Sequence, residues 1–198
     1  MNGAELLGHS TLAVVEKWDE DKVDWVRLKS GILNPKRADF MRYACTPDET
    51  VEDDRPNLTT TLGLGILTNT LINVTTANFS AANLCAIGVG DSSTTAAVGD
   101  TDLNATTNKY YEVADSTPTR VTTTVTNDTL QVVATFASAN GNFAWQEWGL
   151  IVATTGTLVS ATTKSGAGTA SLFNHKVASL GTKASGASWA FTVKLTWS

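Results

Sequence analysis

The sequence has few of the residues from which catalytic and metal sites are usually built. Its 198 residues include two histidines, two cysteines and 17% charged side chains. His9 and His175 lie far apart in the chain, and neither belongs to a nucleophile elbow or a catalytic triad motif. A zinc site needs about three or four His, Cys or acidic ligands, which no motif here supplies. We therefore expect no enzymatic activity, no cofactor and no bound metal.

The two cysteines form no CxxC pair and are distant in sequence. Cys85 lies in an apolar run over residues 84–87, a setting typical of a small buried side chain. A disulfide between Cys45 and Cys85 is geometrically allowed but cannot be inferred from their spacing. Since disulfides are rare in reducing compartments, we favour two free thiols.

Long hydrophobic runs and an excess of positive charge are also missing. No apolar run approaches the ~18 residues of a membrane-spanning helix. Residues 1–7 have no basic residue ahead of a long apolar segment, so we expect no signal peptide. The net charge is -5 and the pI about 4.9, whereas nucleic-acid binding usually needs a cationic face. We therefore expect neither a membrane nor a nucleic acid as partner.

The residues that are abundant change along the chain. Thr, Ser, Ala, Asn and Gly dominate after residue 57, while most charged side chains precede it. This shift predicts an N-terminal arm for attachment over residues 1–56 and a β domain over residues 57–198. Within the arm, strand-like runs at residues 10–18 and 23–29 flank an acidic turn and predict a hairpin. A proline-bracketed acidic connector follows over residues 46–56.

Residues 57–198 are predicted to form one helix followed by strands. Asn57 is the expected N-cap of a helix near residues 58–72. Asn140-Gly141 between two apolar runs predicts a hairpin turn. Strands are expected at residues 84–89, 120–125, 130–136, 143–152 and 189–197, with a further candidate at 158–161. The predicted fold is mainly β, an antiparallel β-sandwich or jelly-roll-like domain with one short helix and an N-terminal hairpin arm.

The last strand has the clearest pattern. Large apolar residues alternate with smaller or polar ones from residue 189 to residue 197. This period predicts that Phe191, Val193 and Leu195 are buried, with Trp189 and Trp197 on the same face.

One acidic residue lies inside a strong strand pattern: Glu147, between Trp145 and Trp148. A buried glutamate beside aromatic rings has a raised pKa, which would suit a general acid. The alternative is a structural carboxylate that accepts hydrogen bonds from a neighbouring strand or pairs with Arg120, and we favour that interpretation. Strict alternation places the two tryptophans on opposite faces. An exposed tryptophan would favour sugar binding, which keeps a glycan-binding module as a minor hypothesis.

Two further motifs fall short of known ligand loops. The run Asp100-Thr101-Asp102-Leu103-Asn104 begins like a calcium loop, but Ala105 and Tyr111 stand where an EF-hand needs glycine and an acidic residue. Gly88-Val89-Gly90 follows a strand without the third glycine and the helix of a nucleotide-binding motif. Both are interpreted as ordinary loops.

The order of segments over residues 57–198 resembles that of small virion structural proteins of tailed bacteriophages, of the tail, tail-fibre or minor structural type. The resemblance begins with Asn57-Leu58, which leads into a Gly- and Leu-containing helix. A strand with a Gly88-x-Gly90 loop follows and leads to Asp100-Thr101-Asp102-Leu103. The remaining segments are the Arg120-Val121 strand, residues 142–150 and the alternating strand 189–197. Residues 1–56 match no such pattern.

This resemblance implies a non-enzymatic virion component, assembled in the host cytoplasm, at the tail, neck, baseplate or fibre. Capsid decoration on the head lattice is the alternative location. The implied partners are other virion proteins and copies of the same chain, with a host glycan as a minor candidate. A Thr-, Ser- and Asn-rich sandwich suits such contacts because it presents hydrogen-bonding surfaces, and an arm can add a strand to a neighbour.

The interface candidates in the arm are mostly aromatic: Trp18, Trp25, Arg27, Phe40 and Tyr43. The arm has too few apolar residues for its own core, so Trp18 and Trp25 are expected to be buried against a neighbouring subunit. Residues 57–198 are then expected to fold on their own. In the alternative, the arm packs back onto its own β domain.

Overall fold

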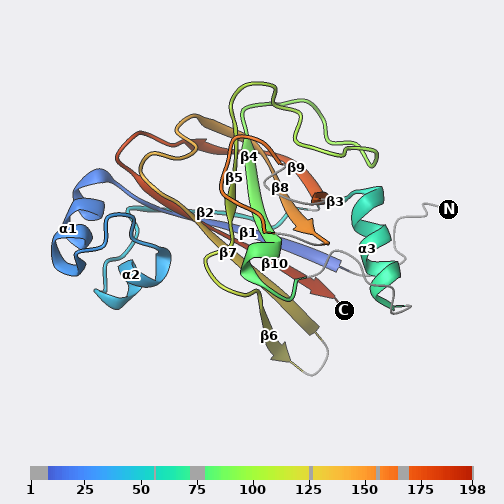
Figure 1. The fold of residues 1–198 in the computed structure, drawn as a ribbon, viewed down its shortest axis with the longest axis horizontal. Helices are drawn as coiled ribbons and strands as arrows, with labels where there is room; N and C mark the ends of the chain where they lie inside the picture. Colours follow the sequence, from blue (N-terminus) through green and yellow to red (C-terminus); the bar gives the residue numbers. More distant parts are fainter. Residues whose placement is uncertain are drawn as a thin grey trace.

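The computed structural model describes residues 9–55, 57–71, 79–124, 127–154, 157–164 and 170–197. They form a mainly β protein of two five-stranded antiparallel sheets (Figure 1). The first sheet has the order β2 (Glu49–Asp53), β1 (His9–Trp18), β10 (Ser188–Trp197), β7 (Asn127–Phe136), β6 (Thr119–Thr124). The second has the order β3 (Leu58–Thr59), β9 (Ala170–Thr182), β8 (Ala144–Ala153), β4 (Cys85–Gly90), β5 (Lys109–Val113). The helices are α1 (Glu20–Ser30), α2 (Arg37–Arg42), α3 (Thr61–Leu71) and the short η1 (Ala82–Leu84).

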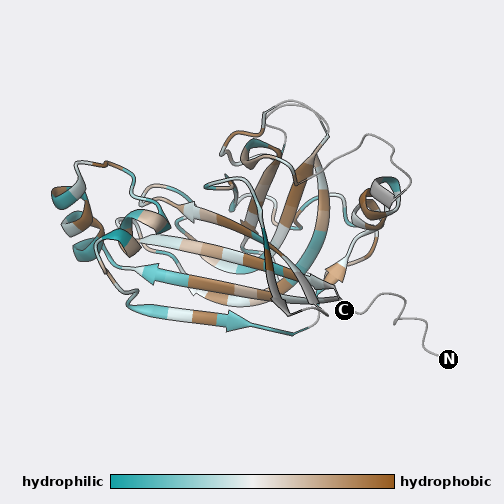
Figure 2. Ribbon diagram, turned by 90° about the horizontal axis from the view of Figure 1, so that it is seen from below, coloured by the Kyte–Doolittle hydropathy of each residue, from teal (hydrophilic) through white to brown (hydrophobic). Residues whose placement is uncertain are grey.

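The main core lies between the facing sides of the two sheets. Phe191, Val193 and Leu195 of β10 are buried there, which confirms the predicted face of this strand, and Trp189 is buried with them. The Phe191 ring lies 5.3 Å from that of Trp148 on β8, across the sandwich. The side chain of Trp197 lies outside the described residues. Alternating hydropathy along the strands is visible in Figure 2.

The second sheet is also covered on its outer side. Loop residues such as Leu103 and Leu158 pack there against Tyr111, Ile151 and Leu172 in a separate apolar cluster. Every residue of β4 is consequently buried, including Gly88, where an added Cβ would lie 2.7 Å from the Tyr111 ring. Strands buried on both faces lose the apolar–polar alternation that makes a half-exposed strand easy to recognise.

Residues 23–29 form part of helix α1, so the predicted second strand of an N-terminal hairpin is wrong. Acidic Glu20 and Asp21 begin the helix, and Gly31 ends it in the left-handed conformation at φ 73°. Val23 and Val26 lie three residues apart, so a helix turns both toward the same neighbours. They pack with Trp18 and Phe40 in a third cluster, on the outer side of the first sheet.

Strand β1 lies inside the first sheet. It pairs with β10 along all of His9–Trp18 and with β2 over Ala13–Lys17. Ala13 and Val15 contribute to the main core. The described part of residues 1–56 therefore packs onto the β domain of its own chain, which is the alternative considered for the arm.

Helix α3 begins later than the sequence predicts. Residues 58–59 form β3, and Thr60 stands at the start of the helix, where its Oγ1 accepts a hydrogen bond from the Gly63 N–H at 3.1 Å. Asn57 is therefore not the cap, and residue 72 lies outside the described residues. A Cβ at Gly63 would lie 2.0 Å from the Phe173 carbonyl oxygen, so this glycine lets α3 approach β9 closely.

Most of the other predicted strands match the structure. β4, β7 and β8 confirm those near residues 84–89, 130–136 and 143–152, and β6 corresponds to the one near 120–125. The candidate at residues 158–161 is a coil with a single bridge from Ala161 to Tyr111. β2, β5 and β9 were not predicted.

Candidate functional site

Two of the predicted interface residues belong to the chain's own core. The rings of Trp18 and Phe40 stack with centroids 4.4 Å apart, and both side chains are fully buried. The Trp18 indole N–H donates to the Cys45 carbonyl at 2.9 Å. Trp18 and Phe40 therefore hold α1 and α2 on the sheet and are not available to a neighbouring subunit, contrary to the expectation for Trp18.

The other three predicted residues lie at or near the surface. Trp25 is 42% exposed and meets Tyr43 edge to face at 6.2 Å. Arg27 pairs with Asp24 at 2.9 Å and also donates to the Ser138 hydroxyl at 2.7 Å. Arg27 thus ties α1 to the loop between β7 and β8, while Trp25 remains accessible.

Large apolar side chains are exposed mainly on the helical unit. Of nine such side chains in the described part of the chain, five belong to α1, α2 and their connection: Trp25, Leu28, Ile32, Leu33 and Met41. We call them the α1–α2 patch. Leu28 and Leu33 are the most open, at 84% and 80%. Concentrated exposed apolar surface commonly marks an interaction site.

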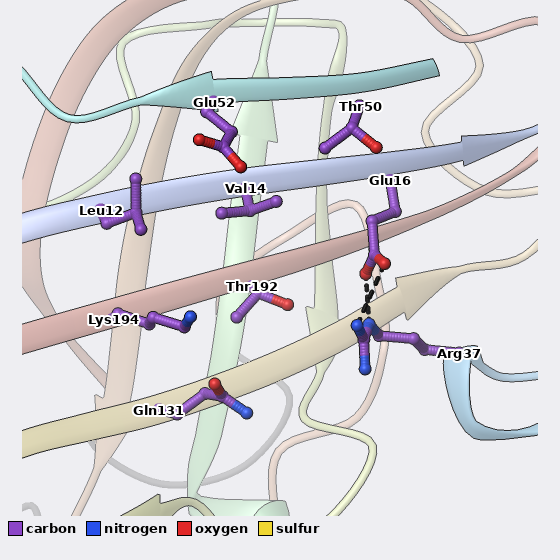
Figure 3. Close-up of a pocket in the computed structure, with 9 residues that line it drawn as sticks. All are labelled: Leu12, Val14, Glu16, Arg37, Thr50, Glu52, Gln131, Thr192 and Lys194. Atoms are coloured by element: carbon purple, nitrogen blue, oxygen red, sulfur yellow. Dashed lines mark hydrogen bonds and ion pairs between the residues drawn. The ribbon is translucent and has the colours of Figure 1, made fainter. Parts of the chain in front are cut away.

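A shallow groove of about 250 Å³ lies on the outer side of the first sheet, beside α2 (Figure 3). It is lined by Leu12, Val14, Glu16, Arg37, Thr50, Glu52, Gln131, Thr192 and Lys194. Arg37 reaches in from α2 and donates two hydrogen bonds to Glu16 of β1. The groove is the part of this sheet face that α1 and α2 leave uncovered, and its mixed polar lining suits hydrogen bonding with a partner.

A buried charged cluster ties a loop to the second sheet. His175 of β9 lies between two carboxylates, with Nε2 2.7 Å from Glu147 of β8 and Nδ1 2.6 Å from Asp100. Glu147 also accepts hydrogen bonds from the backbone N–H groups of Asn104 at 2.9 Å and Ala105 at 2.6 Å. His175 and Glu147 are fully buried.

The electrostatics of this cluster favour a charged imidazolium. Burial alone would lower the pKa of His175, but its hydrogen bonds to Glu147 and Asp100 outweigh burial and raise it. Burial would raise the pKa of Asp100, yet the Ala97 N–H and His175 lower it on balance. Both ring nitrogens face a carboxylate oxygen, so both act as donors and neither is left to accept a proton. This geometry gives Glu147 the hydrogen-bonding role that the sequence favoured, with His175 of the neighbouring strand and two loop N–H groups as its partners.

No sequence pattern marks this cluster. Asp100, Glu147 and His175 are separated by 47 and 28 positions, and only the pairing of β8 with β9 and the return of the 91–108 loop bring them together.

Trp145 and Trp148 do not lie on opposite faces. Both are fully buried in the main core, and the pairing register between β8 and β9 shifts between Trp145 and Glu147. This irregularity turns Trp145 inward, where its indole N–H donates to the Gly141 carbonyl at 2.8 Å. The exposed aromatic side chain on which the glycan hypothesis depended is absent at both positions.

Cys45 and Cys85 are both buried, and neither forms a disulfide. Burial raises the pKa of Cys85 to about 12, as expected for a thiol that serves as a small apolar side chain. Among the described residues, no helix is both long and apolar enough to cross a bilayer. In the same part of the chain, no group of three or more His, Cys, Asp or Glu side chains is arranged to hold a metal ion.

No family model, no curated protein and no solved structure matches this chain.

Proposed function

We propose that this protein is a non-enzymatic structural component of a tailed-phage virion that joins neighbouring subunits at the tail, neck, baseplate or fibre. The observation that carries the proposal is the α1–α2 patch, a set of large apolar side chains presented on a helical projection. Full burial of one leucine or methionine against a partner stabilises a contact by about 1.5–3 kcal/mol. Several such side chains in one place favour attachment to another protein.

The projection that bears the patch is held firmly. Below it, Trp18 and Phe40 stack, and Arg37 is paired with Glu16. Lys36 reaches Asp115 at 3.1 Å. A partner that docks on a pre-ordered surface has less conformational entropy to remove, so more of the contact energy is available for binding. This supports a permanent joint between subunits.

The test uses particles of a phage whose genome encodes the chain. In the Leu28→Asp/Leu33→Asp variant, two charges replace the most exposed apolar side chains of the patch. Val159→Asp is the matched control, because Val159 is 53% exposed and lies outside the helical unit. We expect mass spectrometry of purified particles to find the double variant reduced by about tenfold or more, with the control at the wild-type level. Circular dichroism of the purified proteins checks that each variant is folded.

Two outcomes would overturn parts of this proposal. Wild-type chain missing from washed particles would refute the virion role itself. Normal incorporation of the folded double variant would show that attachment uses another surface, for which the groove beside α2 is the next candidate. Electron microscopy of particles carrying tagged copies then locates the protein, and copies on the head lattice would identify a capsid decoration protein.

A further inference from the structure

A short turn in the loop after β4 lies between the buried His175 cluster and helix α3. The Ala97 N–H donates to the Asp100 carboxylate at 2.7 Å, and the Asp100 N–H donates to the Ala97 carbonyl at 3.0 Å, which closes the turn. The Val98 carbonyl, inside the turn, accepts hydrogen bonds from the Thr61 N–H and hydroxyl at 2.8 and 3.0 Å. The turn therefore connects the imidazole, through Asp100, with the first residue of α3.

The charge of His175 decides how firmly this turn is held on the second sheet. Nδ1 faces Asp100 at 2.6 Å and Nε2 faces Glu147 at 2.7 Å. A neutral imidazole has one N–H, so one of its nitrogens would turn a lone pair toward a carboxylate oxygen. Glu147 keeps two other donors, the N–H groups of Asn104 and Ala105. Within the part of the chain that the structure describes, the Asp100 side chain has one other donor, and it belongs to the same turn. Loss of the proton therefore weakens the attachment of Asp100 more than that of Glu147.

A surface hollow of about 330 Å³ borders the cluster. Its lining comes from the loop, from β3 with the segment before it, and from β9: Arg55, Leu58, Thr95, Ala96, His175, Lys176 and Val177. The two other cations of this lining, Arg55 and Lys176, both pair with Asp53, at 2.8 and 2.9 Å. The loop therefore has open space beside it, and both of these cations already have a carboxylate partner.

The remaining charged groups around the cluster keep one charge state near neutral pH. On β5, the Tyr111 hydroxyl donates to Asp102, which also pairs with Lys109 at 3.1 Å. Burial raises the pKa of Tyr111, so this hydroxyl stays neutral. Burial would raise the pKa of Asp100, but the N–H of its turn and the imidazole lower it, so this carboxylate stays charged. His175 is the group here whose ordinary pKa lies nearest to neutrality.

We infer that the proton of His175 is a latch: it holds the turn of residues 97–100 on the second sheet, and its loss releases the turn and the start of α3. Burial alone would lower the pKa of His175, but its hydrogen bonds to Glu147 and Asp100 raise it. The latch is therefore closed at and below the ordinary histidine pKa of about 6.5 and opens as the pH rises through the folded-state value. This inference holds whichever protein covers the α1–α2 patch.

NMR of the full-length chain from about pH 6 to about pH 9 tests the latch. The nitrogen shifts of the imidazole report the charge of His175. Amide hydrogen exchange, corrected for its intrinsic pH dependence, reports the opening of the turn. We expect the protection of the Ala97, Asp100 and Thr61 amides to fall by about tenfold or more as the ring loses its proton, because a hydrogen bond to a charged group is lost. The amides that Glu147 holds, at residues 104 and 105, should keep their protection.

Two variants of the same loop separate the latch from a general effect of pH. In Asp100→Asn, the new amide donates to a neutral ring nitrogen as readily as it accepts from a protonated one, so the turn should stay protected at high pH. The imidazole of this variant should also lose its proton at a lower pH, because one carboxylate has been removed. Asp91→Asn is the matched control, since Asp91 accepts a hydrogen bond from Asn108 at 2.8 Å and has no contact with His175 among the described residues. It should behave like the wild type.

Several results would overturn the inference. One is a ring that carries a single proton at every pH, and another is a ring that stays doubly protonated over the whole range. Loss of the proton without any loss of protection at Ala97 and Asp100 would show that the turn is held by other contacts. Wild-type pH dependence in the folded Asp100→Asn variant would show that the opening does not pass through Asp100.

Discussion

His175 is a buried side chain whose charge is set by two neighbours. Its pKa in the folded protein is raised, so the folded state holds this proton more tightly than the unfolded chain does. Its contribution to stability is fully present below the ordinary histidine pKa of about 6.5 and is lost as the pH rises through the folded-state value. The stability contributed by Asp100 depends on pH in the opposite sense. Because its pKa is lowered, this contribution is present above about pH 4 and is lost as the pH falls.

The pH dependence of the stability that His175 contributes can be measured with a single substitution. We expect the difference in unfolding free energy between wild type and His175→Gln to be largest below about pH 6 and to shrink as the pH rises. Urea titrations at a series of pH values provide the measurement. Equal pH slopes for wild type and His175→Gln would mean that the imidazole is not held in its charged form.

At the scale of the element, strand β10 is the clearest case of a pattern that specifies its own packing. Its inward residues alternate without interruption, and β1 and β7 hold it on both sides. A strand with two neighbours and one core face has only one register that buries its large side chains.

Phe191 tests that register. Its ring contacts those of Trp145 and Trp148, at centroid distances of 6.2 and 5.3 Å. Phe191→Ala should lower the unfolding free energy by about 3–5 kcal/mol, through lost burial and the cavity that remains. Chemical denaturation gives the value, with the partly exposed Lys194→Ala on the opposite face of the same strand as control. A loss below about 1 kcal/mol would be incompatible with a fully buried ring.

Helix α1 shows where a short pattern misleads. Over residues 23–29, apolar residues fit both a strand and one side of a helix. The termini decide the outcome: acidic residues occupy the first turn, Arg27 and Lys29 the last turn, and Gly31 the left-handed position after it. A buried Trp18–Phe40 pair then favours the helix, because Val23 and Val26 both reach it.

At the scale of the whole molecule, β1 and β2, within residues 9–53, complete the sheet that contains the C-terminal strand. A fragment of residues 57–198 would lose β1 and β2 and leave one side of β10 without a partner. We expect this fragment to be unfolded or aggregated, because the main core loses Ala13 and Val15 and the open edge of β10 favours association with other chains. Circular dichroism and size-exclusion chromatography provide the test. A soluble, cooperatively folding fragment would show that the sandwich does not need β1.

The sequence by itself determined the fold class, the burial of β10 and Cys85, and the position of several strands. The burial of β10 depends on local alternation, since a strand with one buried face must repeat it every two residues. The burial of Cys85 follows instead from the apolar run around it. The same local logic predicted aromatic residues of functional interest near the N-terminus, of which Trp25 and Tyr43 lie at or near the surface.

Only the tertiary structure decided which of these side chains are exposed and which face the core. In the sequence, Trp18 and Phe40 look like Trp25. In the structure, α1 and α2 pack on a sheet so that Trp18 and Phe40 are buried and Trp25 is exposed. Asp100, Glu147 and His175 meet across two strands and a loop. Contacts between residues this far apart in sequence depend on the tertiary fold, and local periodicity carries no information about which distant segments pack together.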